Sequence, residues 1–537
     1  MRRLLTVLLG LVLVGSTTAA LPAYAHNSSV VRPTTLGLVA GADESKSTGT
    51  YAWRGIPYAE PPVGKLRWRA PVTHRPWPGV RDAKHFGDGC VQEGRMFSPA
   101  PSGPHYGLDV RDGLKKPVGA EDCLTLNVFR PATKSKNLPV IVFIYGGSNV
   151  VGYSADPMYD GRALARKANA VVVTVNYRVG VFGWFDLPGN AGSDNFGTLD
   201  QIEALRFVHH NARTFGGDPR NVTVMGESAG AVNVWALLVS PLTKGLLHKA
   251  IPMSGGFNFA TSEQARDYAK EFVREALGEV PDDEREIARR LRSMPADDVI
   301  RAQVRLGARL GDPPRVIPDG KVLPTDYHQA VAEGRYRKVP VLAGNTFEEG
   351  KLFGTAVNAF RPDDYDRFTM QYFFDPDRPS QYTVRDFIND EYLPVDKPGG
   401  WNDAADELTD AIFTGIIHDS MNTLQAAGHQ QLYYYQFGWN QEPAPFNEVY
   451  GSVHAIDLPF VFHTFDEGFF RFAFSKQNEP GRLELSELMI DSIRTFIRTG
   501  SPQHDGLGAQ WEQWPKSMVL DADDKKATAT PGSVDSP

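Results

Sequence analysis

The sequence predicts an α/β fold built on a mostly parallel, twisted sheet flanked by helices, and two observations support this prediction. Residues 139–144 and 170–175 form apolar, β-branched runs, as strands buried on both faces do. Between such runs, residues 202–208 place apolar side chains at helical spacing. Apolar strands that alternate with helices form parallel sheets, and ligands bind beyond the carboxyl ends of those strands.

Length and composition set broad limits on the protein. The chain has 537 residues, 42% of them hydrophobic, which is ample for a large core. Length alone would suggest two to four domains, but large α/β enzymes also form one, and we find no repeat or long low-complexity linker. The net charge of −8 would become −10 on loss of Arg2 and Arg3. We therefore expect no nucleic-acid partner and no binding to anionic membranes.

The two ends of the chain are expected to lie outside the main domain, residues 26–520. Residues 1–25 have two arginines, a short apolar core and Ala23-Tyr24-Ala25, which is typical of a cleaved secretory leader. Cleavage after Ala25 would start the mature chain at His26; Ala20 is a second possible site, and an uncleaved anchor is the alternative. Residues 521–537 are poor in apolar side chains and are predicted to be a disordered tail.

Cys90 and Cys123 are the two cysteines of the chain. In an exported protein this pair predicts one disulfide closing a loop of about 33 residues, and two free buried thiols are the alternative. A metal site would need more Cys or His nearby, so neither cysteine is expected to bind metal or to act in catalysis.

Two glycine-rich segments follow predicted strands. The run 139–144 ends in Tyr145-Gly146-Gly147-Ser148, where glycine allows backbone N–H groups to point at a developing oxyanion; a tight turn without chemistry is the alternative. Residues 226–230, Gly-Glu-Ser-Ala-Gly, lie between a β-branched run and a helical run. Such a strand-turn-helix exposes the central serine, which makes Ser228 the candidate nucleophile; the alternative is an ordinary glycine-bounded turn.

Several long motifs of the chain occur in the order found in one known family. They are residues 55–64, 121–128, 145–147, 176–180, 215–219, 226–230, 240–242, 253–255, 344–350, 454–462 and 498–500. By these motifs the chain resembles the type-B carboxylesterases of the cholinesterase-like α/β-hydrolase group, and the likeness covers nearly all of the predicted mature chain. The resemblance implies an α/β-hydrolase fold, with large loop and helical insertions around an active-site gorge.

The resemblance also implies a catalytic triad of Ser228, Glu349 and His454, in the chain order typical of the fold. Glu348 competes with Glu349 for the acid position. Glu349 is preferred because the family's acid stands directly before the glycine that Gly350 matches.

By the same resemblance, backbone N–H groups of Gly147, Ser148 and Ala229 would bind the oxyanion, and Gly146 would permit the turn of the loop. The family usually has a third glycine and a hydrophobic residue where this chain has Ser148 and Asn149. Both side chains are expected to make the pocket more polar, which hints at substrates with polar acyl or alcohol groups.

Three further features follow from the resemblance or from position. The Cys90–Cys123 pair matches the family's first disulfide. Glu227 is expected to order water or favour cations beside the nucleophile, or else to be a structural salt-bridge residue. Ser254 is expected to form a hydrogen bond that supports the site, with helix capping as the alternative.

These observations favour a secreted serine hydrolase of carboxylic esters. An amide or lactone hydrolase with the same triad and a non-catalytic cholinesterase-like binding module are the alternatives. No metal or organic cofactor is implied, so activity should survive a chelator. The partner is expected to be a small-molecule ester, without stable membrane insertion, and the protein is expected to be a monomer or homodimer. The natural substrate stays open.

Overall fold

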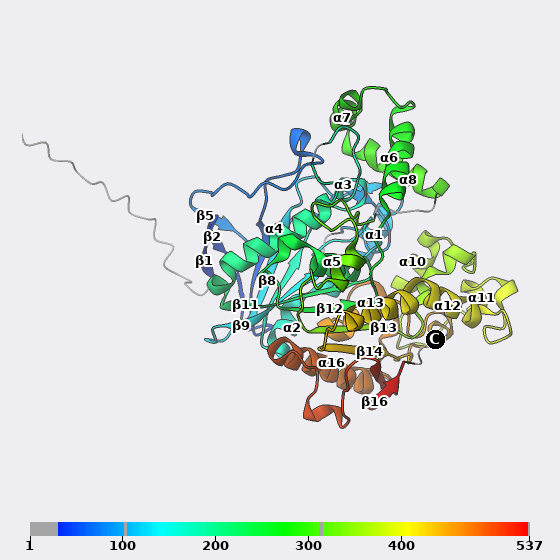
Figure 1. The fold of residues 1–537 in the computed structure, drawn as a ribbon. Coiled ribbons are helices and arrows are strands. Elements are labelled where there is room, and N and C mark those ends of the chain that lie inside the picture. The colour runs from blue at the N-terminus through cyan, green and yellow to red at the C-terminus, as the bar shows by residue number, and fades with distance from the viewer. Residues whose placement is uncertain (1–29, 101–104, 191, 311–314, 535–537) are drawn as a thin grey trace, which may run out of the picture.

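The computed structural model describes residues 30–100, 105–190, 192–310 and 315–534 (Figure 1). The predicted leader, residues 1–25, lies outside them. The described part contains an 11-stranded sheet in the order β16-β15-β14-β13-β12-β11-β9-β10-β8-β4-β3. Its strands are β3 (Ala42–Glu44), β4 (Thr50–Pro57), β8 (Thr125–Pro131), β9 (Leu138–Ile144), β10 (Val171–Val175), β11 (Gly217–Glu227), β12 (Lys249–Met253), β13 (Val341–Thr346), β14 (Leu432–Phe437), β15 (Lys516–Ala522) and β16 (Ala527–Ser533).

The strands from β10 to β15 in this order pair in parallel, and antiparallel strands complete both edges. Strand β8 pairs antiparallel with β10 and β4, and β16 pairs antiparallel with β15. The predicted mostly parallel sheet is confirmed, and the two apolar runs coincide with β9 and β10. Both are fully buried, which is why their sequences do not alternate.

Helices cover both faces of the sheet (Figure 1). Helices α4 and α5 pack on one face against β11, while α2 and α16 pack on the other. The helices are α1 (Tyr106–Gly113), α2 (Gly161–Ala168), α3 (Gly180–Gly183), α4 (Phe196–Asn211), α5 (Ala229–Val239), α6 (Ser262–Leu277), α7 (Glu284–Ser293), α8 (Ala296–Leu310), α9 (Tyr327–Ala332), α10 (Asp364–Tyr372), α11 (Val384–Phe387), α12 (Trp401–Thr409), α13 (Gly415–Ala426), α14 (Phe446–Val449), α15 (Leu458–Phe462) and α16 (Glu479–Thr499). Within the described chain, no helix is long and apolar enough to cross a membrane.

The charged helices α6, α7 and α8 form a group of their own, which stands away from the sheet in Figure 1. Their apolar faces pack on one another and around Trp68 in a second hydrophobic core. The remaining strands form two small sheets, β1 (Val31–Thr34), β2 (Gly37–Ala40) and β5 (Val80–Asp82) in one, β6 (Gln92–Glu93) and β7 (Pro117–Val118) in the other.

The prediction that residues 521–537 form a disordered tail is wrong for most of this segment. Residues 516–522 and 527–533 pair in register, from Lys516 opposite Ser533 to Ala522 opposite Ala527. Strand β15 also pairs with β14 through Met518, Val519 and Leu520, so the middle of the strand is paired on both sides. The short hairpin therefore orders a polar segment through backbone hydrogen bonds, which composition does not reveal. Only residues 535–537 of the predicted tail lie outside the described chain.

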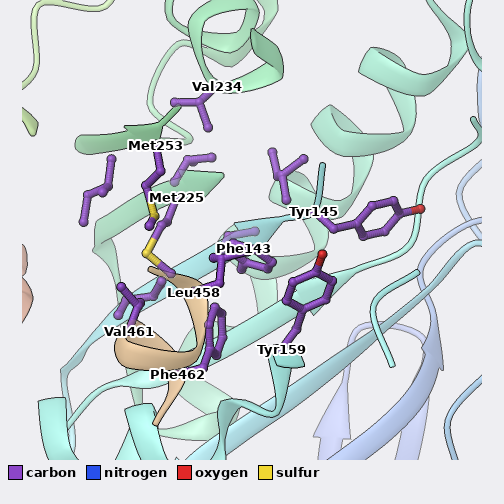
Figure 2. Close-up of a cluster of buried hydrophobic side chains, with 14 of the residues drawn as sticks. Phe143, Tyr145, Tyr159, Met225, Val234, Met253, Leu458, Val461 and Phe462 are labelled. Atoms are coloured by element: carbon purple, nitrogen blue, oxygen red, sulfur yellow. The ribbon is translucent and has the colours of Figure 1, made fainter. Parts of the chain in front are cut away.

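An apolar cluster lies beneath the carboxyl ends of the central strands (Figure 2). Met225 of β11 and Met253 of β12 lie side by side and approach α15, which carries Leu458. Phe143 of β9 meets the ring of Phe462 edge-on, with centroids 4.8 Å apart. This packing holds the ends of β9, β11 and β12 together with the segment that leads into α15.

Candidate active site

Ser228 lies at the sharp turn between β11 and α5. Its backbone is in a strained conformation, with φ 57° and ψ −126°, and its N–H donates to the carbonyl of Met253 at 2.8 Å. A serine held in this way projects from the end of the strand instead of continuing it. This is the strand-turn-helix expected from the sequence.

The turn is possible because its flanking residues are glycines. A Cβ on Gly230 would lie 2.1 Å from the carbonyl oxygen of Ile144, and one on Gly226 would lie 2.5 Å from that of Gly230. Helix α5 therefore approaches β9 and β11 so closely that a side chain at either position would force the backbone apart.

His454 and Glu349 meet in the buried interior at the ends of β13 and β14. Nδ1 of His454 contacts Oε2 of Glu349 in a short hydrogen bond. The other oxygen, Oε1, accepts hydrogen bonds from the hydroxyl of Ser254 at 2.6 Å and the N–H of Thr346 at 2.8 Å. With both oxygens engaged, the carboxylate fixes the orientation of the imidazole ring. Ser254 thus binds within the site and does not cap a helix.

Glu348, the competing acid, is directed elsewhere. It pairs with Lys351 at 2.6 Å, and its carboxylate accepts the N–H of Ser452 at 2.7 Å. The structure therefore places Glu349, and not its neighbour, against His454.

The second ring nitrogen of His454 lies 3.0 Å from Oε1 of Glu227. Burial raises the pKa of the Glu227 carboxyl to about 8. Burial would lower the pKa of His454, but Glu227 and Glu349 outweigh it and raise that pKa to about 9. The pair therefore holds a proton near neutral pH, either on the imidazole or on the carboxyl. Within the described residues, the Ser228 hydroxyl makes no hydrogen bond.

Asp457 is a buried acid that the sequence reasoning did not single out. Burial raises its pKa to about 7, and Tyr435 donates a hydrogen bond to it at 2.8 Å. Its negative charge helps to raise the pKa of both Glu227 and His454. The sequence signal that could have identified Asp457 is its position three residues after His454, within the matching segment 454–462.

The loop after β9 carries consecutive residues in the left-handed region. Gly147, Ser148 and Asn149 have φ of 90°, 54° and 59°. Within the described chain, the N–H groups of Gly147, Ser148 and Ala229 donate no hydrogen bond, which leaves three donors beside Ser228. Ser148 lines the cavity described below, as expected.

Asn149 departs from the expectation that it makes the pocket more polar. It is buried, and its amide oxygen accepts a hydrogen bond from Asn233 at 2.9 Å. It lies outside the cavity lining among the described residues. The left-handed turn at Asn149 directs the side chain toward α5, and the amide pair anchors the loop to that helix.

One cavity of about 280 Å³ brings most of the predicted residues together, while Glu349, Ala229 and Ser254 lie outside its lining. It is lined by Ser228, His454, Glu227, Gly146, Gly147 and Ser148, and its other walls are largely apolar. Its volume is close to the lower end of the range for small-molecule sites, about 300–1,000 Å³. A larger cavity of about 1050 Å³, near α2, includes neither Ser228 nor His454.

The remaining predictions concern the cysteines and metals. Cys90 and Cys123 form a disulfide, with an S–S distance of 2.04 Å, so the pairing is confirmed. Among the described residues, no group of three or more His, Cys, Asp or Glu side chains is arranged to hold a metal ion.

Known proteins are similar to this chain over almost its entire length. The model of the carboxylesterase family matches residues 28–531. Para-nitrobenzyl esterase of Bacillus subtilis is 34% identical over 503 residues, 91% of this chain and 94% of that protein. Cholinesterase of Mus musculus is 31% identical over 453 residues, covering 80% of this chain and 73% of that protein.

Solved structures give the same result. A PNB esterase structure superposes with a TM-score of 0.74 at 32% identity, covering 94% of this chain and 97% of that one. A carboxylesterase from Geobacillus stearothermophilus gives 0.72 at 30% identity, with 94% and 98% covered. The fold is that of the α/β-hydrolases, and the protein belongs to the carboxylesterase family of carboxylic-ester hydrolases.

Proposed function

We propose that the protein is a secreted serine hydrolase that cleaves carboxylic esters through Ser228, His454 and Glu349 and an acyl-enzyme intermediate. The observation that supports this most is the buried Glu349–His454 hydrogen bond, which lies beside the cavity that the strained Ser228 lines. Nucleophile, base and orienting acid are the three parts that nucleophilic acyl transfer requires.

In the proposed reaction, neutral His454 takes the proton of Ser228 through Nε2 as the serine oxygen attacks the ester carbonyl. Because Nε2 contacts Glu227 in the structure, substrate binding must bring the serine oxygen into hydrogen-bond contact with it. Glu349 holds the Nδ1–H tautomer and stabilises the imidazolium.

The oxyanion would be received by the unpaired N–H groups of Gly147, Ser148 and Ala229. The left-handed backbone at Gly147 and Ser148 leaves two of these donors without a partner in the described chain, so they are available before substrate arrives. His454 then protonates the departing alcohol, and water repeats the sequence to release the acid.

We also propose that the protein is exported after cleavage of residues 1–25. The Cys90–Cys123 disulfide supports this proposal, since such bonds persist in oxidising compartments. N-terminal sequencing of the protein from culture medium should begin at His26; retention of the whole chain inside the cell would contradict the proposal.

The experiment for the reaction is steady-state hydrolysis of p-nitrophenyl butyrate by the wild type and Ser228→Ala. Loss of the nucleophile should lower kcat by about 10⁴–10⁶. Ser47→Ala, at an exposed turn outside the lining of this cavity, is the matched control and should keep full activity. Equal activity of Ser228→Ala and the wild type would reject the mechanism.

A further inference from the structure

Three charged side chains line the active-site cavity apart from Glu227 and His454. They are Arg95, Asp364 and Arg367. Most of the remaining lining is apolar, including Phe97, Val151, Met158, Leu352 and Phe353. A charged side chain in a small, largely apolar cavity interacts strongly with a ligand, because water screens its charge poorly there.

Arg367 is a buried cation at this wall. The residue is only 3% exposed, although it belongs to the partly exposed helix α10. Its Nη2 donates to Asp364 at 2.6 Å, and its guanidinium carbon lies 4.1 Å from the ring centroid of Phe360. Within the described chain, its Nε and Nη1 donate no hydrogen bond. Both atoms keep some exposure to solvent, so they can donate to a ligand in the cavity.

Arg95 supplies a second cation from a different segment. Its Nε donates to Glu93 at 2.7 Å, which holds the side chain in place. Glu93 offsets much of the charge of Arg95, because the two groups are in contact, but it engages only Nε. No described residue accepts a hydrogen bond from Nη1 or Nη2 of Arg95.

The wall thus carries two arginines, each paired with one carboxylate, and each keeps further N–H groups that donate to no described residue. Arginine is suited to anionic ligands because its planar N–H groups match the two oxygens of a carboxylate. A cationic ligand would meet Asp364 only in competition with Arg367.

We propose that Arg95 and Arg367 select esters that carry a free carboxylate remote from the scissile bond. The proposal rests on the proposed function and names the substrate class of the same site. Ser228 attacks the ester group, while the remote carboxylate accepts hydrogen bonds from the guanidinium groups at the wall. The carboxylate could belong to the acyl half or to the alcohol half, and the test separates the two.

The test compares kcat/KM for matched esters. For the acyl half, mono-p-nitrophenyl glutarate is paired with its neutral terminal amide and with cationic p-nitrophenyl 5-aminopentanoate. For the alcohol half, 4-carboxyphenyl butyrate is paired with 4-carbamoylphenyl butyrate. We expect the anionic ester of one pair to exceed its neutral partner by at least about tenfold, equivalent to about 1.4 kcal/mol.

Variants then assign the preference to the two arginines. Arg367→Gln and Arg95→Gln should each reduce the ratio of anionic to neutral kcat/KM several-fold. Arg361→Gln is the matched control, because Arg361 pairs with Asp390 at 3.1 Å and lies outside the described cavity lining; its ratio should equal that of the wild type. The side chain of Arg95 is 54% exposed, so Arg95→Gln should fold even if Arg367→Gln does not.

Three outcomes would overturn the proposal: neutral partners hydrolysed as fast as the anionic esters in both pairs, a preference for the cationic ester, or an anionic preference that survives in Arg95→Gln. Failure of the proposed function is distinguishable from these, since it would leave the neutral esters unhydrolysed as well.

Discussion

Replacement of Glu227 by glutamine should shift the pH dependence of catalysis to lower pH. In the structure, Oε1 of Glu227 lies 3.0 Å from Nε2 of His454, the nitrogen that accepts the serine proton in the proposed reaction. The negative charge favours the imidazolium, which cannot act as a base. As pH rises through the pKa of His454, the neutral base forms and kcat/KM increases.

The size of the shift follows from the geometry. At an effective dielectric constant of 20, two unit charges at this distance attract by about 5.5 kcal/mol, equivalent to about 4 pKa units. The effect should be smaller, because burial raises the pKa of Glu227 itself to about 8 and leaves it only partly ionised near neutral pH. In the wild type, kcat/KM should rise with pH through a midpoint near the raised His454 pKa of about 9. We expect this midpoint to fall by at least one pH unit in Glu227→Gln.

The assay is the pH dependence of kcat/KM for a neutral p-nitrophenyl ester, which reports groups of the free enzyme. Glu348→Gln is the matched control, since Glu348 pairs with Lys351 and not with His454; its midpoint should stay with the wild type. An unchanged or more alkaline midpoint in Glu227→Gln would refute the reasoning, whatever the maximal kcat/KM of the variant.

Three further substitutions test the site, the disulfide and the packing of α5 against the sheet. Glu349→Gln should lower kcat by about 10³–10⁴, because an amide no longer holds the Nδ1–H tautomer, while Glu348→Gln should lose less than tenfold; steady-state kinetics separates the two. Replacing Cys90 and Cys123 by serine should lower the free energy of unfolding by about 4 kcal/mol for the 33-residue loop, and equal urea midpoints would contradict this. Gly230→Ala should lower it by about 3 kcal/mol, because the new Cβ meets a strand carbonyl at 2.1 Å; unfolding indistinguishable from the wild type would contradict the close approach.

The sequence was informative where a residue type is dictated by close backbone contact. Gly226 and Gly230 are required by the approach of α5 to β9, so the turn at Ser228 was predictable from five residues and their context. The fully buried strands β9 and β10 were equally visible, because burial on both faces leaves continuous apolar runs.

Other features depend on contacts between distant segments and were not accessible. The contact of Glu227 with His454 spans 227 residues of sequence separation and arises only when β11 meets the segment after β14. The direction of Asn149 depends on its left-handed backbone and on Asn233 of α5. The ordered hairpin of β15 and β16 depends on backbone pairing to β14, which a polar sequence does not reveal.

The sequence also left the substrate open, for the same reason. Arg95 and Arg367 come from segments 272 residues apart, and nothing in their local sequence marks either as part of a binding wall. Only the folded cavity brings them to one surface with Ser228.

The most direct test of the account is covalent labelling of the nucleophile. The wild-type protein is treated with a fluorophosphonate, and the adduct is located by peptide mass spectrometry. We expect one adduct per chain, on Ser228, and none in Ser228→Ala. An adduct on another residue, or a wild-type protein that hydrolyses esters yet takes up no label, would contradict the assignment of Ser228 as nucleophile.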